Sequence, residues 1–267
     1  EISLEEARQC AQVLFEGQTI YEYEGRRTRQ ELEELILRYR QSLADEEWLW
    51  EEAQGDPETM QAIRESMEAD LAVWESQYAD APDEKDRREA EWTFKPYMAY
   101  EKYSDVVEGD AELDQTLRMK LMAQLDGKEA YLDVKNRTEE DYQLHNLRFW
   151  VDNAYQSTPL DQSPEEAAAM VQETLQAMGL EQWVLDSCQS IYMEGNPNSA
   201  NEVYAQDRYY YHLTYKPAYE GVPVIPQSQL EGSEGMEAYT SRYYYENLTV
   251  EVSGGRIIYL QWDAPLQ

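Results

Sequence analysis

The chain has 267 residues, with 55 acidic and 22 basic side chains and a formal net charge of −33 at pH 7. Hydrophobic residues make up 42% of it, which is enough for a packed core and excludes a wholly disordered chain. The charge disfavours binding to nucleic acids and to anionic membrane surfaces, which would repel it. Because no run of 18 apolar residues occurs, no transmembrane segment is predicted. The acidity indicates a solubility coat, or else a cationic partner or bound divalent metal ions.

The first predicted element is a helix that begins at Ser3. In the stretch "SLEEA", Ser3 and Glu6 form a capping box, which satisfies the first free amide groups of a helix. The same box returns in "SPEEA", where Ser163 and Glu166 begin a second helix. Each helix is expected to end at a glycine, the usual left-handed stop, at Gly17 and Gly179.

Two long helices are predicted between these points, over residues 28–54 and 57–78. Gly55 ends the first, Asp56 caps the second, and Pro57 occupies its first position. Because the link is short, the two helices should form an antiparallel hairpin over about residues 28–78. Each helix has an apolar stripe at helical spacing, namely Leu32, Leu35, Ile36, Tyr39 and Leu43 in the first, and Met60, Ile63, Met67, Leu71, Trp74 and Tyr78 in the second.

Two β-hairpins are predicted at "DGKEAYL" (126–132) and "GGRIIYL" (254–260). Asp-Gly and Gly-Gly are preferred two-residue turns, and alternating apolar residues flank both of them. The repeated order of helix and hairpin predicts a tandem duplication with a boundary near residues 158–163. Residues 3–17 plus 117–151 are then expected to superpose on 163–179 plus 242–262. The alternative is two unrelated α+β segments built from common parts.

We therefore predict an α+β fold of two related helix-plus-antiparallel-sheet modules. The first module covers residues 1–158 and carries the helical hairpin as an insertion. The second module covers residues 159–267.

Three consecutive tyrosines follow an arginine twice, in "RYYYHLTYKPAY" from residue 208 and in "RYYYENLTVEV" from residue 242. Both stretches are predicted to be strands of one sheet, joined by a largely irregular connection over residues 216–240. Tyr209, Tyr211, Leu213 and Tyr215 share one face of the first strand, which is expected to lie against the second helix. The opposite face is either an ordinary outer sheet face or an amphipathic ligand platform. Its candidate binding residues are Tyr210, His212, Tyr243 and Tyr245.

The sequence shows no catalytic signature and no standard metal-binding pattern, so no cofactor or metal is predicted. His145 and His212 are interpreted as residues on strand faces, because neither has a second histidine nearby. Cys10 and Cys188 are interpreted as two buried thiols, although an oxidising compartment would permit a disulfide between them. The acidic loop at residues 80–86 is a weak alternative for calcium, since its spacing matches no standard loop.

The second half resembles the small extracytoplasmic α/β modules of bacterial lipoproteins. The matching stretches are "SPEEAAAMVQETLQAMGL", "YEGVPVIP" and "YYYENLTVEVSGGRIIYLQWDAPL". The chain is similar to uncharacterised lipoproteins of Gram-positive gut bacteria, and more distantly to PepSY-type domains and regulators of cell-wall sensor kinases. This resemblance implies a protein outside the cytoplasm, anchored through a lipid signal that precedes the sequence shown. The long helical hairpin departs from the pattern.

The expected function is therefore binding, sensing or regulation without catalysis, with a cell-envelope ligand, a peptide or a membrane protein as partner. One alternative is a hydrolase that uses carboxylates on cell-wall glycan or peptide. The other is a structural protein that docks a partner through the helical hairpin.

Overall fold

The computed structural model describes residues 1–23, 26–96, 117–136, 145–196, 202–219, 222–223 and 247–264. The fold is α+β, as predicted. It divides into two compact units, which are described separately below. Unit 1 contains Glu1–Glu22, Arg88–Met193 and Asp207–Gln267, and unit 2 contains Tyr23–Arg87 and Glu194–Gln206.

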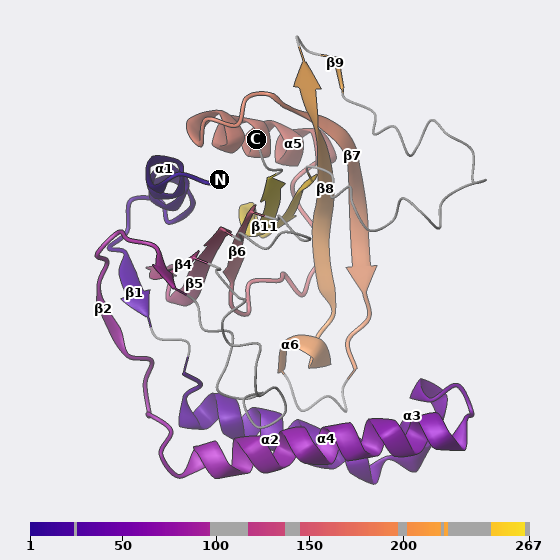
Figure 1. Cartoon of the computed structure of the whole chain (residues 1–267). Coiled ribbons are helices and arrows are strands. Elements are labelled where there is room, and N and C mark those ends of the chain that lie inside the picture. The colour runs from indigo at the N-terminus through magenta and orange to yellow at the C-terminus, as the bar shows by residue number, and fades with distance from the viewer. Residues whose placement is uncertain are drawn as a thin grey trace, which may run out of the picture. The chain divides into compact units, whose positions relative to one another are not determined.

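Unit 1 is built on a sheet that draws strands from both halves of the chain (Figure 1). The order along the sheet is β2-β1-β4-β5-β6-β11-β10-β8-β7, with β3 beside β4 and β9 beside β8. Neighbouring strands from β1 to β7 along this order are antiparallel. The strands are β1 (Tyr21–Tyr23), β2 (Arg87–Glu89), β3 (Lys95–Pro96), β4 (Leu117–Leu125), β5 (Lys128–Asn136), β6 (His145–Val151), β7 (Trp183–Met193), β8 (Arg208–Tyr219), β9 (Val222–Pro223), β10 (Asn247–Ser253) and β11 (Arg256–Ala264).

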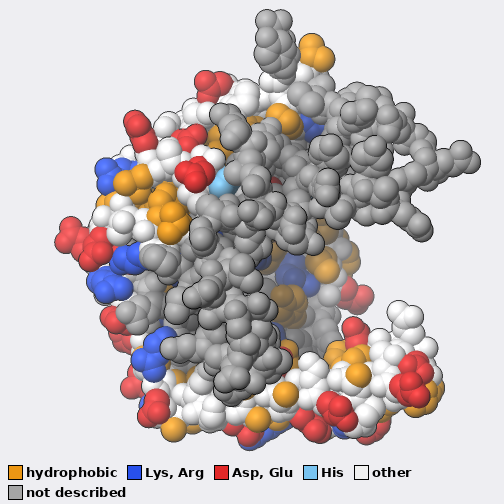
Figure 2. Space-filling model, viewed as in Figure 1, with side chains coloured by type: hydrophobic (Ala, Val, Ile, Leu, Met, Phe, Trp, Pro, Cys, Tyr) orange, Lys and Arg blue, Asp and Glu red, His pale blue; other side chains and the backbone are white. Residues whose placement is uncertain are grey.

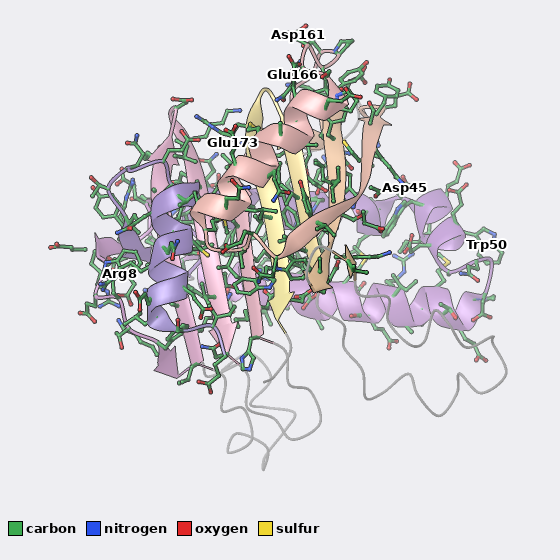
Figure 3. The ribbon with its side chains drawn as sticks, turned by 90° about the horizontal axis from the view of Figure 1, so that it is seen from above. Arg8, Asp45, Trp50, Asp161, Glu166 and Glu173 are labelled. Carbon is green, nitrogen blue, oxygen red and sulfur yellow. The ribbon has the colours of Figure 1, made fainter. Side chains whose placement is uncertain are left out.

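Two helices, α1 (Leu4–Leu14) and α5 (Pro164–Ala177), lie on the same face of this sheet (Figure 3). Both begin with the predicted capping box, in which each serine hydroxyl accepts from a glutamate backbone N–H at 3.2 Å. A glycine with positive φ follows each helix, as predicted, at +73° for Gly17 and +78° for Gly179. The helices bury their apolar side chains in the core shared with the sheet, namely Ala7, Cys10, Ala11, Leu14, Ala167, Val171 and Leu175.

The side chain of Asn136 ties the start of the chain into this core. Its Oδ1 accepts from the backbone N–H of Ile2 at 3.0 Å, and its Nδ2 donates to the Ile2 carbonyl at 2.9 Å. Asn136 is only 4% exposed and Ile2 only 1%. The amide therefore completes backbone hydrogen bonds that would otherwise be buried without a partner. Ile2 enters the core one residue before the cap of α1.

The two predicted hairpin turns are confirmed. Residues 126–127 join β4 to β5, residues 254–255 join β10 to β11, and all four of these residues have positive φ. The second turn is linked to the first by Arg256, which donates from Nη2 to Asp126 at 2.6 Å and from Nε to Glu16 at 3.1 Å. Both turns therefore lie at the same end of the sheet.

Apart from the short strands β2, β3 and β9, each half has the same order of elements along the chain, and its strands run in that order inward across the sheet. α1 is followed by β1, β4, β5 and β6, and α5 is followed by β7, β8, β10 and β11, so the halves meet where β6 pairs with β11. The prediction that the two hairpin turns are equivalent is wrong, because they join different strands of their halves. The first turn joins the second and third strands of its half, whereas the second turn joins the third and fourth. The boundary predicted between residues 158 and 159 lies inside unit 1, because one sheet spans both halves.

Unit 2 contains α2 (Arg29–Ala44), α3 (Glu46–Glu52), α4 (Pro57–Tyr78) and the short α6 (Glu202–Ala205). Helices α2 and α4 pack side by side. The Tyr39 ring is edge-on to the Trp74 ring at 4.4 Å between centroids, and Arg40 pairs with Glu75 at 2.6 Å. The continuous helix expected over 28–54 is wrong, because Asp45 leaves the helical conformation and accepts a hydrogen bond from the Trp48 N–H. None of the helices in the described ranges is long and apolar enough to cross a membrane.

Candidate functional site

The two faces of β8 separate as the sequence predicts from Tyr211 onward, whereas Tyr209, also expected on the core face, is only half-buried. Tyr211, Leu213 and Tyr215 are buried in the core on the side of the helices, and the Tyr211 hydroxyl donates to the Gln162 carbonyl at 2.8 Å. Tyr210 and His212 alternate with them and are half-buried on the opposite face, which we call the outer face. The other two predicted binding residues, Tyr243 and Tyr245, lie outside the described residues.

Glu251 is the centre of a polar cluster on the outer face. It lies opposite His212 in the register of β10 and β8. Its Oε2 accepts from the Tyr155 hydroxyl at 2.6 Å, and its Oε1 lies 3.6 Å from His212 Nδ1. The Glu251 side chain is 15% exposed and that of His212 is 34% exposed. Since 3.6 Å is too long for a strong hydrogen bond, the imidazole can turn toward a ligand instead.

Tyr155 reaches this cluster from the segment after β6, which is hydrogen-bonded to the end of β10 and the start of β8. The Gln156 backbone N–H donates to Ser253 Oγ at 2.8 Å, and the Gln156 carbonyl accepts from the Tyr209 N–H at 2.9 Å. The Tyr155 ring meets the Tyr210 ring edge-on at 5.2 Å between centroids, and the Arg208 guanidinium lies 5.8 Å from its centroid. These contacts hold the Tyr155 hydroxyl in place over Glu251.

The electrostatics of the cluster keep its tyrosines protonated. Burial raises the pKa of the Tyr155 hydroxyl, and the hydrogen bond to Glu251 raises it further. Burial and the charge of Glu251 also raise the pKa of Tyr210. Both hydroxyls therefore remain protonated; that of Tyr155 donates to Glu251, and that of Tyr210 donates to Met193 Sδ at 3.7 Å.

The cluster is one end of a continuous row of side chains across the outer face. Residues opposite each other in an antiparallel sheet have neighbouring side chains, about 5 Å apart. The register places six side chains in one row, Gln189, His212, Glu251, Tyr259, Trp150 and Tyr131. We call this set the aromatic row. Within it, Tyr131 and Trp150 stack at 5.1 Å, and the Arg148 guanidinium lies 5.3 Å from the centroid of Tyr259.

This arrangement favours recognition of a ligand. A carboxylate, an imidazole and tyrosine hydroxyls offer polar contacts, and the half-buried rings of Tyr210, Tyr259 and Trp150 offer apolar contact, whereas Tyr131 is fully buried. Among the described residues, Glu251 contacts a tyrosine and a histidine. No group of three or more metal-ligating side chains is found among the described residues. Cys10 and Cys188 are both free thiols.

Sequence reasoning found two members of the cluster, Tyr210 and His212, but missed Tyr155 and Glu251. Glu251 had a local signal, because it alternates with the buried Val250 and Val252 and so had to face outward. Tyr155 had no such signal, since it lies outside a strand in the link between the halves.

Comparison with known proteins found no family model, no curated protein and no solved structure that matches this chain.

Proposed function

We propose that the protein is a non-catalytic binding protein that holds a polar ligand on the outer face of its sheet, around Glu251. The observation that carries the proposal is the cluster of Tyr155, Glu251, His212 and Tyr210, in which a partly exposed imidazole stands beside a mostly buried carboxylate. A buried carboxylate held by one tyrosine keeps further acceptor positions for donors of a ligand. The neighbouring rings suit a ligand with a flat apolar face. Sugar rings and extended peptides both have these properties, and both occur in the cell envelope.

The only support that the site gives for a role outside the cytoplasm is that sugar rings and extended peptides, the ligands it suits, occur in the cell envelope. The resemblance to bacterial lipoproteins favours the same place, and on that basis we propose an envelope protein that senses or regulates by binding. The strongly acidic surface is consistent with partners that carry positive charge or none.

The proposal is tested by binding to purified bacterial cell wall. The protein should co-sediment with insoluble peptidoglycan. His212→Ala and Glu251→Gln should each weaken the affinity for it by about tenfold, because each removes one charge-assisted contact. Gln176→Ala, an exposed change on α5, is the control and should bind like the unaltered protein. Equal binding by all four proteins would mean that the cluster is not the site.

We also propose that the two halves of unit 1 arose by duplication, with equivalences set by strand order. Leu132 and Val134 on β5 then correspond to Leu248 and Val250 on β10, and all four are buried core residues. At the junction, "LRFW" of β6 corresponds to "LQWD" of β11, with Arg148 opposite Gln261. The helices α2, α3 and α4 of unit 2, which follow β1, are then an insertion in the first half.

A further inference from the structure

One end of the helical part of unit 2 combines exposed tryptophan side chains with concentrated negative charge. The short helix α3 exposes Trp48 and Trp50, at 36% and 48%. Asp45 and Trp50 mark this end in Figure 3, and Figure 2 shows acidic and hydrophobic side chains together there. Residues 45–58 include seven acidic side chains and no basic one: Asp45, Glu46, Glu47, Glu51, Glu52, Asp56 and Glu58. We call Trp48, Trp50 and these carboxylates the tryptophan tip.

The two rings of the tryptophan tip project from a fixed backbone. Leu49, between them, is fully buried, and Asp45 Oδ1 accepts from the Trp48 N–H at 3.0 Å. The Trp50 ring lies against the backbone of Gly55, whose φ is +76°. A Cβ atom at Gly55 would be 3.5 Å from that ring. Because the backbone of α3 is set by these contacts and the Trp50 ring has a neighbour within the fold, binding would order little new backbone.

The negative charge of the tip is mostly unbalanced. Along the rest of α2 and α4, some carboxylates have basic partners, namely Glu75 with Arg40 at 2.6 Å and Glu31 with Lys85 at 2.9 Å. At the tip, Glu46 pairs with Arg64 at 2.7 Å. For the other tip carboxylates, the described part of the chain provides no basic side chain within 4.0 Å. Exposed tryptophans surrounded by uncompensated carboxylates are not needed for solubility, which charged residues alone would supply.

We propose that the tryptophan tip docks an arginine-rich segment of a partner protein. Tryptophan is the side chain whose face best attracts a cation, and a guanidinium can stack on the ring while it donates paired hydrogen bonds to a carboxylate. Tryptophan and arginine are also the residues that most often dominate binding energy at protein interfaces. Anionic lipids and nucleic acids are repelled by the same carboxylates. The proposal is independent of the site around Glu251, which lies in unit 1.

The test measures binding of a fluorescently labelled hexa-arginine peptide to the full chain by anisotropy. We expect Trp48→Ala with Trp50→Ala to weaken binding at least about tenfold, as removal of hot-spot rings does. The triple change Glu47→Gln, Glu51→Gln and Glu52→Gln should weaken it to a similar degree without removing a buried side chain. The unaltered protein should also bind hexa-arginine more tightly than hexa-lysine, because an ammonium cannot stack on a ring while forming paired hydrogen bonds.

A matched control separates the tip from the net charge of the protein. Glu5→Gln, Glu173→Gln and Glu181→Gln change three exposed acids of unit 1, and so alter the net charge equally. If this control loses as much affinity as the tip triple, binding follows overall charge and the proposal is overturned. Undiminished binding by the tryptophan variant would also overturn it. Tryptophan-dependent co-sedimentation with phosphatidylcholine vesicles, without hexa-arginine binding, would replace a protein partner with a membrane surface.

Discussion

The hydroxyl of Tyr155 donates a hydrogen bond to the carboxylate of Glu251 over 2.6 Å, although the two residues are 96 positions apart in the chain. Glu251 comes from β10 in the second half of unit 1, and Tyr155 from the segment that leaves β6 in the first half. The contact therefore depends on the pairing of the halves. It places the candidate site beside their junction.

Replacing Tyr155 with phenylalanine tests what this contact contributes to stability. A hydrogen bond to a charged group stabilises by about 1.5–3 kcal/mol. Since Glu251 can recover some hydration, we expect the free energy of unfolding in urea to fall by about 1.5 kcal/mol. Tyr192→Phe is the control, because the Tyr192 side chain is exposed and its hydroxyl is 3.3 Å from Asp207. Equal stability of both variants would show that the Tyr155 hydroxyl contributes nothing.

Asn136→Ala should destabilise unit 1 more strongly. The change leaves the N–H and carbonyl of the buried Ile2 without their partners, and each unsatisfied group costs about 1–3 kcal/mol. We expect a loss of at least about 2 kcal/mol in urea unfolding. Asn247→Ala, at an exposed position on β10, should change stability by less than about 0.5 kcal/mol. A neutral result at Asn136 would mean that water replaces the amide.

His145 should make stability depend on pH. The side chain is fully buried, and neither ring nitrogen has a hydrogen-bond partner among the described residues. Burial lowers the pKa of its imidazole below the value of about 6.5 expected in the unfolded chain. Between the two pKa values the unfolded state binds more protons than the folded state. The stability contributed by the neutral, buried imidazole is therefore fully present above about pH 6.5 and is lost as the pH falls below that value.

The measurement compares urea unfolding at two pH values, about 7.5 and about 5.5, chosen to bracket the unperturbed histidine pKa. In His145→Leu the loss of stability on acidification should be smaller than in the unaltered protein. Gln176→Ala, an exposed change on α5 that removes no titratable group, should leave the loss unchanged. If the leucine variant loses as much stability as the parent, carboxylates rather than His145 cause the effect.

Trp74→Ala should lower the melting temperature of unit 2. Trp74 is 5% exposed and packs in a small cluster with Leu32, Ile36 and Ala81. Truncation of a buried tryptophan costs about 3–5 kcal/mol, because apolar burial is lost and a cavity remains. Circular dichroism should show earlier melting of helical signal, whereas the exposed Trp48→Ala should melt like the parent. An unchanged melting transition in Trp74→Ala would mean that the apolar stripe of α4, which includes Trp74, faces solvent.

The duplication can be tested with residues 159–267 alone. The sheet order leaves β11 without its β6 neighbour in such a fragment. A second copy of β11 could take that place, with Leu260 opposite Trp262 in the way that Leu260 now faces Phe149. Light scattering after size-exclusion chromatography should therefore show a dimer. A folded monomer, identified by circular dichroism, would argue against equivalence of β6 and β11.

The sequence by itself determined the features that depend on neighbours three or four residues apart. The capping boxes at Ser3 and Ser163 join a cap residue to a glutamate three positions on. The tight turn at residues 126–127 needs only its own two residues in the left-handed conformation. The two faces of β8 follow from the period of a strand, which is why His212 was placed on the outer face from sequence.

The tertiary structure decided which distant elements meet. Strands β6 and β11 are more than a hundred residues apart, and apolar alternation alone does not specify a partner strand. The equivalence of the hairpin turns was misjudged for that reason, because turn chemistry does not reveal a strand's position in the sheet. The break at Asp45 also escaped prediction, because an aspartate side chain can either cap a new helix or remain in solvent. In the fold, burial of Leu49 favours the new helix that Asp45 caps. Glu251 became the centre of a candidate site only when the fold brought Tyr155 to it.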